Sequence, residues 1–184
     1  MILGYYDRTE AKANPFNLPY LGDEREGNSL IKIKESDAPV FVGIGANSIR
    51  QKLIGLLAEK GLFSVVVIHP RAVISSLATI GEGSFVAAGT MVNPLAKIGK
   101  GAIINTGAII EHECQIGDYV HVAPGAVLAG NVYVGEGSFI GANAVVKQGV
   151  FIGKNVVIGA GSVVVKNVPD NLVLVGNPAI ELKK

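Results

Sequence analysis

Aliphatic residues recur at every sixth position over about half of the chain. Each sixth residue from Ile74 to Val164 is Ile, Val or Leu. The fourth residue after each of these is small or β-branched, as at Ala78, Ser84 and Cys114. A short repeat sustained over this length is typical of solenoids, in which each unit buries its apolar side chains against the units above and below. The pattern therefore predicts many short strands stacked in parallel.

A second period, of eighteen residues, is superimposed on the first. It is marked by glycines that each follow an aliphatic residue: Gly81, Gly99, Gly117, Gly135 and Gly153. One corner in three therefore needs glycine, either for a positive φ or for close backbone approach. Three six-residue units thus make one coil, and we expect a mainly β domain over residues 71–184, a three-sided solenoid of about five coils. The period leaves the handedness open, although the general crossover rule favours a right-handed path.

The residue before each inward aliphatic position points outward, and these residues form three columns. Two columns are largely apolar and the third is more polar; they read Val73, Met91, Ile109, Val127, Val145, Val163; Phe85, Ile103, His121, Phe139, Val157; and Thr79, Lys97, Gln115, Tyr133, Phe151. Long apolar stripes on a surface indicate burial against a partner. We therefore expect a homotrimer in which two sides of each prism face neighbouring subunits.

The composition changes before Ile74, and residues 1–70 form a different unit. The predicted elements are strands over residues 2–6, 40–44 and 63–68, a loop with short elements over 11–38, and a helix over about 49–60. Ser48 and Gln51 form a capping-box pattern at the helix start. The apolar face of this helix is expected to comprise Ile49, Leu53, Leu56 and Leu57. This order predicts a small parallel α/β unit whose ligand edge lies at the carboxyl ends of its strands.

Two features fall at that edge. Asp7 ends the first predicted strand, where a carboxylate could bind a ribose or a base, and the turn from Gly45 to Ser48 precedes a helix start that could receive an anion. On the residues alone, a loop aspartate and a helix cap are the more ordinary interpretations of the same positions.

Composition narrows the functional classes. The net charge of +1 and the absence of Trp give no support for binding nucleic acid or an anionic membrane surface. No apolar run reaches the length of a membrane span, and no signal peptide is evident, so we expect a cytoplasmic protein. The single cysteine, Cys114, excludes an intrachain disulfide framework and lies in the small-residue column, where a buried core role is expected.

The segment INTGAIIEHECQIGDYVHVAPGAVLAGNV resembles the hexapeptide-repeat sugar acetyltransferases that include sialic acid O-acetyltransferases (NeuD type) and UDP-4-amino-sugar N-acetyltransferases (PglD type). GYYDR, FVGIGANSIR and VIHP are similar to the N-terminal domain of this family, and VGNPA is similar to its ending. The resemblance implies a left-handed β-helix preceded by a truncated Rossmann-like α/β domain. It also implies a trimer that binds acetyl-CoA, with no metal, in the cleft between adjacent subunits.

The resemblance also implies residue roles. His112 matches the family's general base, and Glu113 matches the residue that raises its basicity. The positions matching acetyl-CoA contacts are His121, Ala142 and Ala160, and those matching nucleotide-sugar contacts are Asp7, Gly45 and Ser48, with Arg8 in place of a second acidic residue. Family members usually begin with a further strand and a glycine-rich phosphate loop. Neither is found here, so we expect either an upstream start or a different mode of acceptor binding.

The chemistry is consistent with these roles. An amine or hydroxyl that attacks a thioester must lose a proton, and histidine has a suitable pKa. His112 and His121 are half a coil apart and leave different sides of one prism, so they can share a site only between subunits. Asn105, at a coil corner before them, is expected to serve its turn, and His69 to be a structural linker residue.

Three alternatives remain open. A metalloenzyme of the γ-carbonic anhydrase kind needs three histidine ligands, whereas His69 is far from the other two histidines in the repeat. A non-catalytic solenoid would use the fold as a scaffold. Among acetyltransferases, we favour a nucleotide-linked 4-amino sugar as acceptor over the hydroxyl of sialic acid or another glycan.

Overall fold

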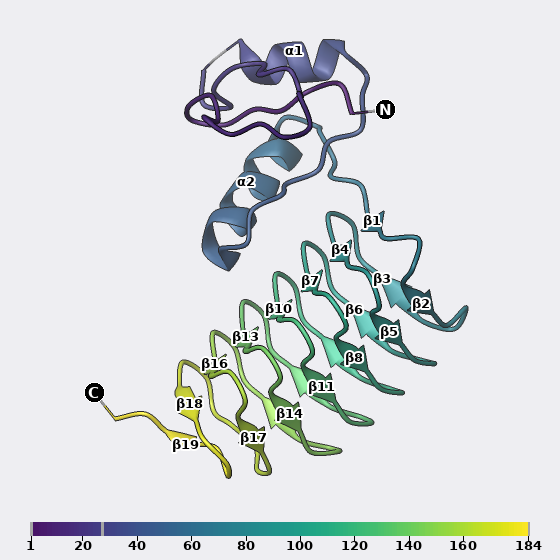
Figure 1. The fold of residues 1–184 in the computed structure, drawn as a ribbon, viewed down its shortest axis with the longest axis vertical. Helices are drawn as coiled ribbons and strands as arrows, with labels where there is room; N and C mark the ends of the chain where they lie inside the picture. The colour runs from purple at the N-terminus through teal and green to yellow at the C-terminus, as the bar shows by residue number, and fades with distance from the viewer. Residues whose placement is uncertain (1, 27, 184) are drawn as a thin grey trace.

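The computed structural model describes residues 2–26 and 28–183. Figure 1 shows a long solenoid with an irregular N-terminal unit beside it. The helices are α1 (Ser29–Glu35) and α2 (Asn47–Glu59), and the strands are β1 (Val67–Ile68), β2 (Val73–Ile74), β3 (Thr79–Ile80), β4 (Phe85–Val86), β5 (Met91–Val92), β6 (Lys97–Ile98), β7 (Ile103–Ile104), β8 (Ile109–Ile110), β9 (Gln115–Ile116), β10 (His121–Val122), β11 (Val127–Leu128), β12 (Tyr133–Val134), β13 (Phe139–Ile140), β14 (Val145–Val146), β15 (Phe151–Ile152), β16 (Val157–Ile158), β17 (Val163–Val164), β18 (Val173–Val175) and β19 (Ile180–Glu181).

The strands form three sheets, one for each side of a prism. An eight-stranded sheet runs from β1 to β19, a six-stranded sheet from β2 to β17, and a five-stranded sheet from β3 to β15. From β1 to β17, each strand pairs in parallel with the strand eighteen residues away, so that His121 lies opposite both Ile103 and Phe139. The predicted solenoid is confirmed. It completes about six turns rather than the predicted five, because β1 and β18 extend the repeat at both ends.

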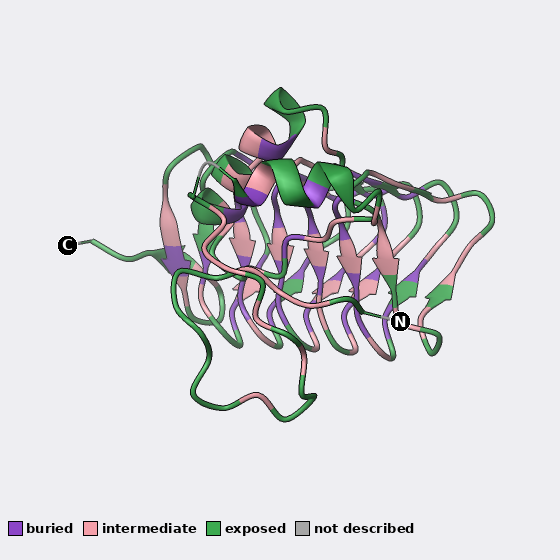
Figure 2. Cartoon of the chain, turned by 90° about the horizontal axis from the view of Figure 1, so that it is seen from above, coloured by how far each residue is buried: buried purple, intermediate pink, exposed green. Residues whose placement is uncertain are grey.

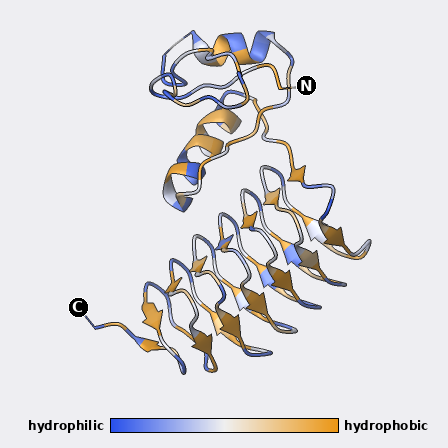
Figure 3. Ribbon diagram, in the orientation of Figure 1, coloured by the Kyte–Doolittle hydropathy of each residue, from blue (hydrophilic) through white to orange (hydrophobic). Residues whose placement is uncertain are grey.

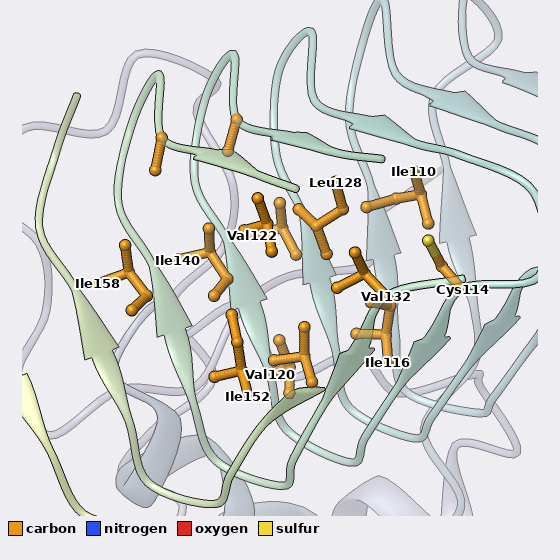
Figure 4. Packing of buried hydrophobic residues seen from close by; sticks show 14 of the residues in the cluster. Ile110, Cys114, Ile116, Val120, Val122, Leu128, Val132, Ile140, Ile152 and Ile158 are labelled. Atoms are coloured by element: carbon orange, nitrogen blue, oxygen red, sulfur yellow. The ribbon is translucent and has the colours of Figure 1, made fainter. Parts of the chain in front are cut away.

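The inward aliphatic residues form one continuous core along the solenoid axis. Ile104, Ile110, Leu128 and Ile140 are completely buried, as is Cys114 in the small-residue column. Figure 4 shows Ile110, Cys114, Leu128 and Ile140 among the side chains that stack between successive coils. Burying one such aliphatic side chain contributes about 1.5–3 kcal/mol, which explains why the six-residue repeat is kept so strictly. Figure 3 shows that most strands are hydrophobic and that many of the turns between them are hydrophilic.

The glycines at eighteen-residue spacing serve close backbone approach rather than a positive φ. A Cβ placed on Gly81 would lie 2.6 Å from the carbonyl carbon of Gly99, and one on Gly135 would lie 2.5 Å from that of Gly153. Neither Gly81 nor Gly135 has a left-handed backbone. Any side chain at these corners would force two coils apart, so the sequence uses glycine at one corner of every coil.

The chain reverses direction at its C-terminal end. β18 continues the eight-stranded sheet, and β19 pairs with β18 antiparallel. The preceding segment also covers the other two sheets, since the Val168 amide donates to Phe151 O and the Ala179 amide donates to Val163 O. The last strand of each sheet therefore has a hydrogen-bonded neighbour.

The N-terminal unit is more irregular than the sequence predicts. The strands expected over residues 2–6 and 40–44 appear only as single parallel bridges, Tyr5 with Tyr20 and Val40 with Ser64. The strand expected over 63–68 shortens to β1, which belongs to the solenoid. Within the described residues this unit therefore has no sheet of its own, and its Rossmann-like character is not confirmed. Figure 2 shows how much of its chain is exposed.

The predicted helix is confirmed as α2, but its start and its buried face differ from the prediction. Its N-cap is Ala46, which makes no side-chain capping bond, so the capping box of Ser48 and Gln51 does not form. The side chains that pack inward are Ile54 and Leu57, against Tyr119 of the solenoid, while Ile49 is 44% exposed. The physical reason is the solenoid, which offers α2 a surface that an isolated α/β unit would not have. A second helix, α1, lies where a loop with short elements was expected.

Candidate active site

His112 lies in the turn between β8 and β9, at the edge where the six-stranded sheet meets the five-stranded sheet. Its side chain is half exposed, and its Nδ1 lies 3.1 Å from Oε2 of Glu113. Glu113 occupies the left-handed region at φ 62°, a conformation that the same turn also imposes on Leu95 and Asn131 in the neighbouring coils. Because a carboxylate can only accept, Nδ1 is the donor in this pair, and in the neutral ring Nε2 is then the nitrogen without a proton.

Gly130, one coil further along, lies directly against the His112 ring. A Cβ on this glycine would be 2.4 Å from His112 Nε2 and 2.5 Å from Cε1. Its backbone is not left-handed, so the space for the ring, and not the turn, requires a glycine here. The His112 imidazole is thus oriented from two sides, by the Glu113 carboxylate and by the backbone of Gly130.

His121 lies in β10 on the eight-stranded sheet, and its side chain is partly buried. Its Nε2 is 3.1 Å from the Asn105 amide nitrogen, and its ring meets Phe139 edge-on with centroids 5.0 Å apart. Its Nδ1 is buried and has no hydrogen-bond partner among the residues that the structure describes. Burial lowers the pKa of His121 below 6.5, the nearby Arg50 cation lowers it further, and the backbone of Gly45 acts weakly in the opposite direction. Burial and the Arg50 charge therefore both favour the neutral imidazole.

Asn105 does more than the turn role expected of it. Its Oδ1 accepts from the Thr106 amide at 2.8 Å, as a turn asparagine should, while its Nδ2 contacts His121. Ala142 and Ala160 lie two and three coils beyond Thr106 in the same column, in the turns that follow β13 and β16. Asn105 and the two alanines therefore line the edge between the eight-stranded and six-stranded sheets, beside His121. His112 lies at a different edge, and no contact joins it to His121 within one chain.

Two of the three expected acceptor residues meet at a cavity of about 400 Å³ between α2 and the eight-stranded sheet. Its lining comprises Gly45, Ala46, Asn47, Ser48, Gln51, Gly137, Phe139, Asn155 and Val157. Asp7 is not among these residues. It is exposed, and its carboxylate accepts from the Arg8 amide at 2.6 Å. The structure thus brings Gly45 and Ser48 close to the His121 side of the solenoid and leaves Asp7 apart.

Sequence reasoning missed Gly130, Asn105 and Arg50 as parts of this arrangement. Gly130 breaks the polar column that contains His112, and a glycine at a position that needs no positive φ could have indicated it. Arg50 is an arginine inside a helix, and nothing in the pattern marks it as buried.

In the described part of the chain, no three His, Cys, Asp or Glu residues lie close enough together to hold a metal ion. No helix there is long and apolar enough to cross a membrane.

The repeat matches two family models. Residues 95–130 match the bacterial transferase hexapeptide (six repeats), and residues 131–166 match the hexapeptide repeat of succinyl-transferase. No protein among the curated sequences matches the chain.

Three solved structures are similar over nearly the whole chain. The acetyltransferase domain of PglB from Neisseria gonorrhoeae in complex with acetyl coenzyme A is 33% identical, over 97% of this chain and 85% of that one, with a TM-score of 0.90. PerB from Caulobacter crescentus in complex with CoA and GDP-perosamine is 41% identical, over 91% and 80%, with a TM-score of 0.87. WeeI from Acinetobacter baumannii is 31% identical, over 97% and 85%, with a TM-score of 0.83.

Proposed function

The chain belongs to the hexapeptide-repeat sugar acetyltransferases, and from this membership we propose that it transfers the acetyl group of acetyl-CoA to the amino group of a nucleotide-linked 4-amino sugar. The cofactor is acetyl-CoA, used as a co-substrate. The observation that carries the proposal is His112, half exposed, held by Glu113 and presenting its Nε2 as a base. The PerB complex with GDP-perosamine supports an amino-sugar acceptor, and a UDP-linked sugar of the same class is the other candidate.

The proposed reaction needs one proton acceptor and no covalent enzyme intermediate. His112 Nε2 accepts a proton from the amine as its nitrogen attacks the thioester carbonyl, and the Glu113 carboxylate stabilises the resulting imidazolium through Nδ1. The C–S bond then breaks, and the CoA thiolate takes up the proton that His112 accepted. We assign His121, Ala142 and Ala160 to the thioester and CoA, since they lie along one edge of the solenoid.

The two parts of the chain are proposed to bind different substrates. Residues 71–184 bind acetyl-CoA and supply the base, while residues 1–70 hold the nucleotide part of the acceptor. Gly45 and Ser48 at the start of α2 are the favoured acceptor contacts, because both line the cavity beside the eight-stranded sheet. The helix start offers free backbone amides to a phosphate. Asp7 is proposed as an acceptor contact from the family resemblance alone.

We further propose that the solenoid is left-handed and that the active sites lie between the subunits of a homotrimer. His112 and His121 face different sides of one prism, and a neighbouring subunit would bring the two sides together. The six-stranded sheet supports this arrangement, since Val73 (63%), Met91 (42%) and Val145 (41%) are exposed. The other apolar stripe is partly covered within the chain, where Phe41 packs against Phe85 and Asn47 reaches Gly137, so it needs a neighbour less than the sequence suggested.

The test measures CoA release from acetyl-CoA with UDP- and GDP-linked 4-amino sugars and with sialic acid as acceptors. We expect turnover with a nucleotide-linked amino sugar, and a loss of about 10²–10⁴-fold in kcat for His112→Ala, the range of a general base. His69→Ala is the matched control, because the His69 ring accepts a hydrogen bond from the Arg71 amide in a turn outside the site. Near-wild-type turnover of His112→Ala would refute the base. Turnover with sialic acid alone would establish O-acetylation instead. Absence of acetyl-CoA binding would favour a non-catalytic solenoid that serves as a scaffold.

A further inference from the structure

Arg50, in the first turns of α2, is almost completely buried, with 1% of its surface exposed. Each of its five N–H groups has an acceptor. Nε donates to Gly101 O at 2.6 Å, Nη1 to Ile44 O and Gly45 O at 3.0 Å each, and Nη2 to Asn47 Oδ1 and Tyr119 O at 2.9 Å each. A guanidinium with all five donors satisfied has no freedom left to rotate, so its partners are fixed relative to one another.

These acceptors come from two parts of the fold. Ile44, Gly45 and Asn47 form the turn that opens α2, while Gly101 and Tyr119 belong to successive coils of the solenoid. The Asn47 side chain extends the connection, since its Nδ2 donates to Gly137 O at 2.9 Å. The three solenoid positions are eighteen residues apart in sequence, so the start of α2 is attached to three consecutive coils at the same corner.

Within the described part of the chain, the guanidinium is held by carbonyl and amide oxygens and by no carboxylate. Burial lowers the pKa of Arg50 to about 10, which records the free-energy cost of keeping this cation out of water. A buried ionic group without a charged partner is a poor way to gain stability, because apolar side chains of similar size can do as well or better. The arrangement is better explained by the geometry that it fixes.

That geometry joins the two halves of the candidate active site. Gly45, an acceptor of Arg50, lines the cavity where the nucleotide sugar is proposed to bind. Tyr119, another acceptor, lies two residues before His121 in the chain, and the Arg50 charge also acts on the pKa of that histidine. One side chain thus contacts both the acceptor turn and the coil that carries the thioester side of the site.

We propose that Arg50 is a positioning residue for acetyl transfer, which fixes the acceptor-binding turn Gly45–Ser48 relative to the coil that carries His121. This inference rests on the proposed function. When Arg50 is replaced, the turn is free to shift against the solenoid, and the nucleotide sugar binds and presents its amine less well. Acetyl-CoA contacts lie on the solenoid itself, so its binding is retained.

The experiment compares Arg50→Lys and Arg50→Met with Lys52→Met, a control that removes a positive charge from an exposed site on the same helix. Steady-state KM for the nucleotide sugar and for acetyl-CoA, kcat and Tm are measured for each, well below the melting temperature. We expect Arg50→Lys to raise the KM of the nucleotide sugar about tenfold or more while the KM of acetyl-CoA stays within about twofold, since a displaced substrate loses binding and orientation. Lys52→Met is expected to leave both constants unchanged.

A second readout does not depend on turnover. The His121 pKa, followed by NMR of its ring proton, is expected to rise in Arg50→Met because a nearby positive charge has gone. An unchanged KM for the nucleotide sugar in active Arg50 variants, or equal changes in both KM values, would overturn the proposal. Failure of both variants to fold would show a purely structural role and overturn it as well. A wild-type protein without transfer activity would count against the proposed function, and the NMR comparison would still decide whether Arg50 acts on His121.

Discussion

Replacing Gly130 with alanine is the most direct perturbation of the His112 ring that leaves His112 itself in place. The three atoms nearest to a Cβ at this position all belong to His112, with Nε2 at 2.4 Å. Ordinary contacts between such atoms are about 3.5 Å, so the imidazole must move by about 1 Å. The ring is half exposed and can move into solvent, so the backbone is expected to tolerate the alanine.

The size of the effect follows from this displacement. Misplacing a catalytic group by about 1 Å can reduce the rate by roughly 10²-fold, equivalent to about 2.7 kcal/mol in activation free energy. Stability should change little or rise by up to about 1 kcal/mol, since alanine restricts the unfolded chain and Gly130 is not in the left-handed region. Gly130→Ala is thus expected to be a folded protein with a slow chemical step.

A double-mutant cycle with His112→Ala gives the assay its discriminating power. CoA release is measured for both single variants and the double variant, with Gly55→Ala in α2 as a control glycine that has open space around it. If the added methyl acts by moving the imidazole, it should have almost no further effect once His112 is absent. The same 10²-fold loss in the His112→Ala background would mean that the methyl blocks a substrate, and the reasoning would be wrong.

Three further outcomes are expected. Glu113→Gly should raise the free energy of unfolding by about 1 kcal/mol, since glycine tolerates φ 62° better than glutamate does, while kcat falls. Thermal melting and turnover are measured on the same variant, and a less stable variant would contradict the prediction. The folded-state pKa of His121 lies below 6.5, so the unfolded chain binds this proton more readily than the folded protein does. Tm should therefore decline as pH falls from 6.5 through the folded-state pKa, and it should decline less in His121→Asn. Cys114 is buried, donates to Ala129 O, and has its thiol pKa raised by burial, so a thiol reagent should label only unfolded protein.

The solenoid was predictable because its information is local and repeated. The aliphatic residue at every sixth position is buried in the same way in every coil, and an atypical residue at a single position does not hide the repeat. The N-terminal unit carries no such redundancy. Val40 and Phe63 belong to apolar runs that suit strands, yet α2 buries Ile54 and Leu57 against Tyr119 instead of completing a sheet. Which surface α2 would meet depends on the solenoid, and this cannot be inferred from residues 1–70 alone.

The candidate site divides in the same way. The proposed base His112 and its proposed partner Glu113 are adjacent in sequence, and the structure shows them paired. Gly130 and Asn105 meet the two histidines in neighbouring coils. A comparison of residues eighteen positions apart could have indicated Gly130 beside His112, and one of residues sixteen apart could have indicated Asn105 beside His121. Arg50 lies 69 residues from Tyr119, and only the docking of α2 brings them together.

The C-terminal segment has a consequence for the behaviour of the molecule in concentrated solution. Nothing in the hydrogen-bond pattern of a parallel sheet ends the addition of strands. An uncovered last coil would therefore offer its unpaired amides and carbonyls to the first coil of another molecule. Here Val168, Ala179 and β19 take up one sheet edge each, and β19 runs in the opposite direction to the strands of the ladder. Removing residues 167–183 would expose three aligned edges at once. The shortened chain is expected to stack end to end into fibres, whereas the covered edges limit the protein to assemblies formed through its sides.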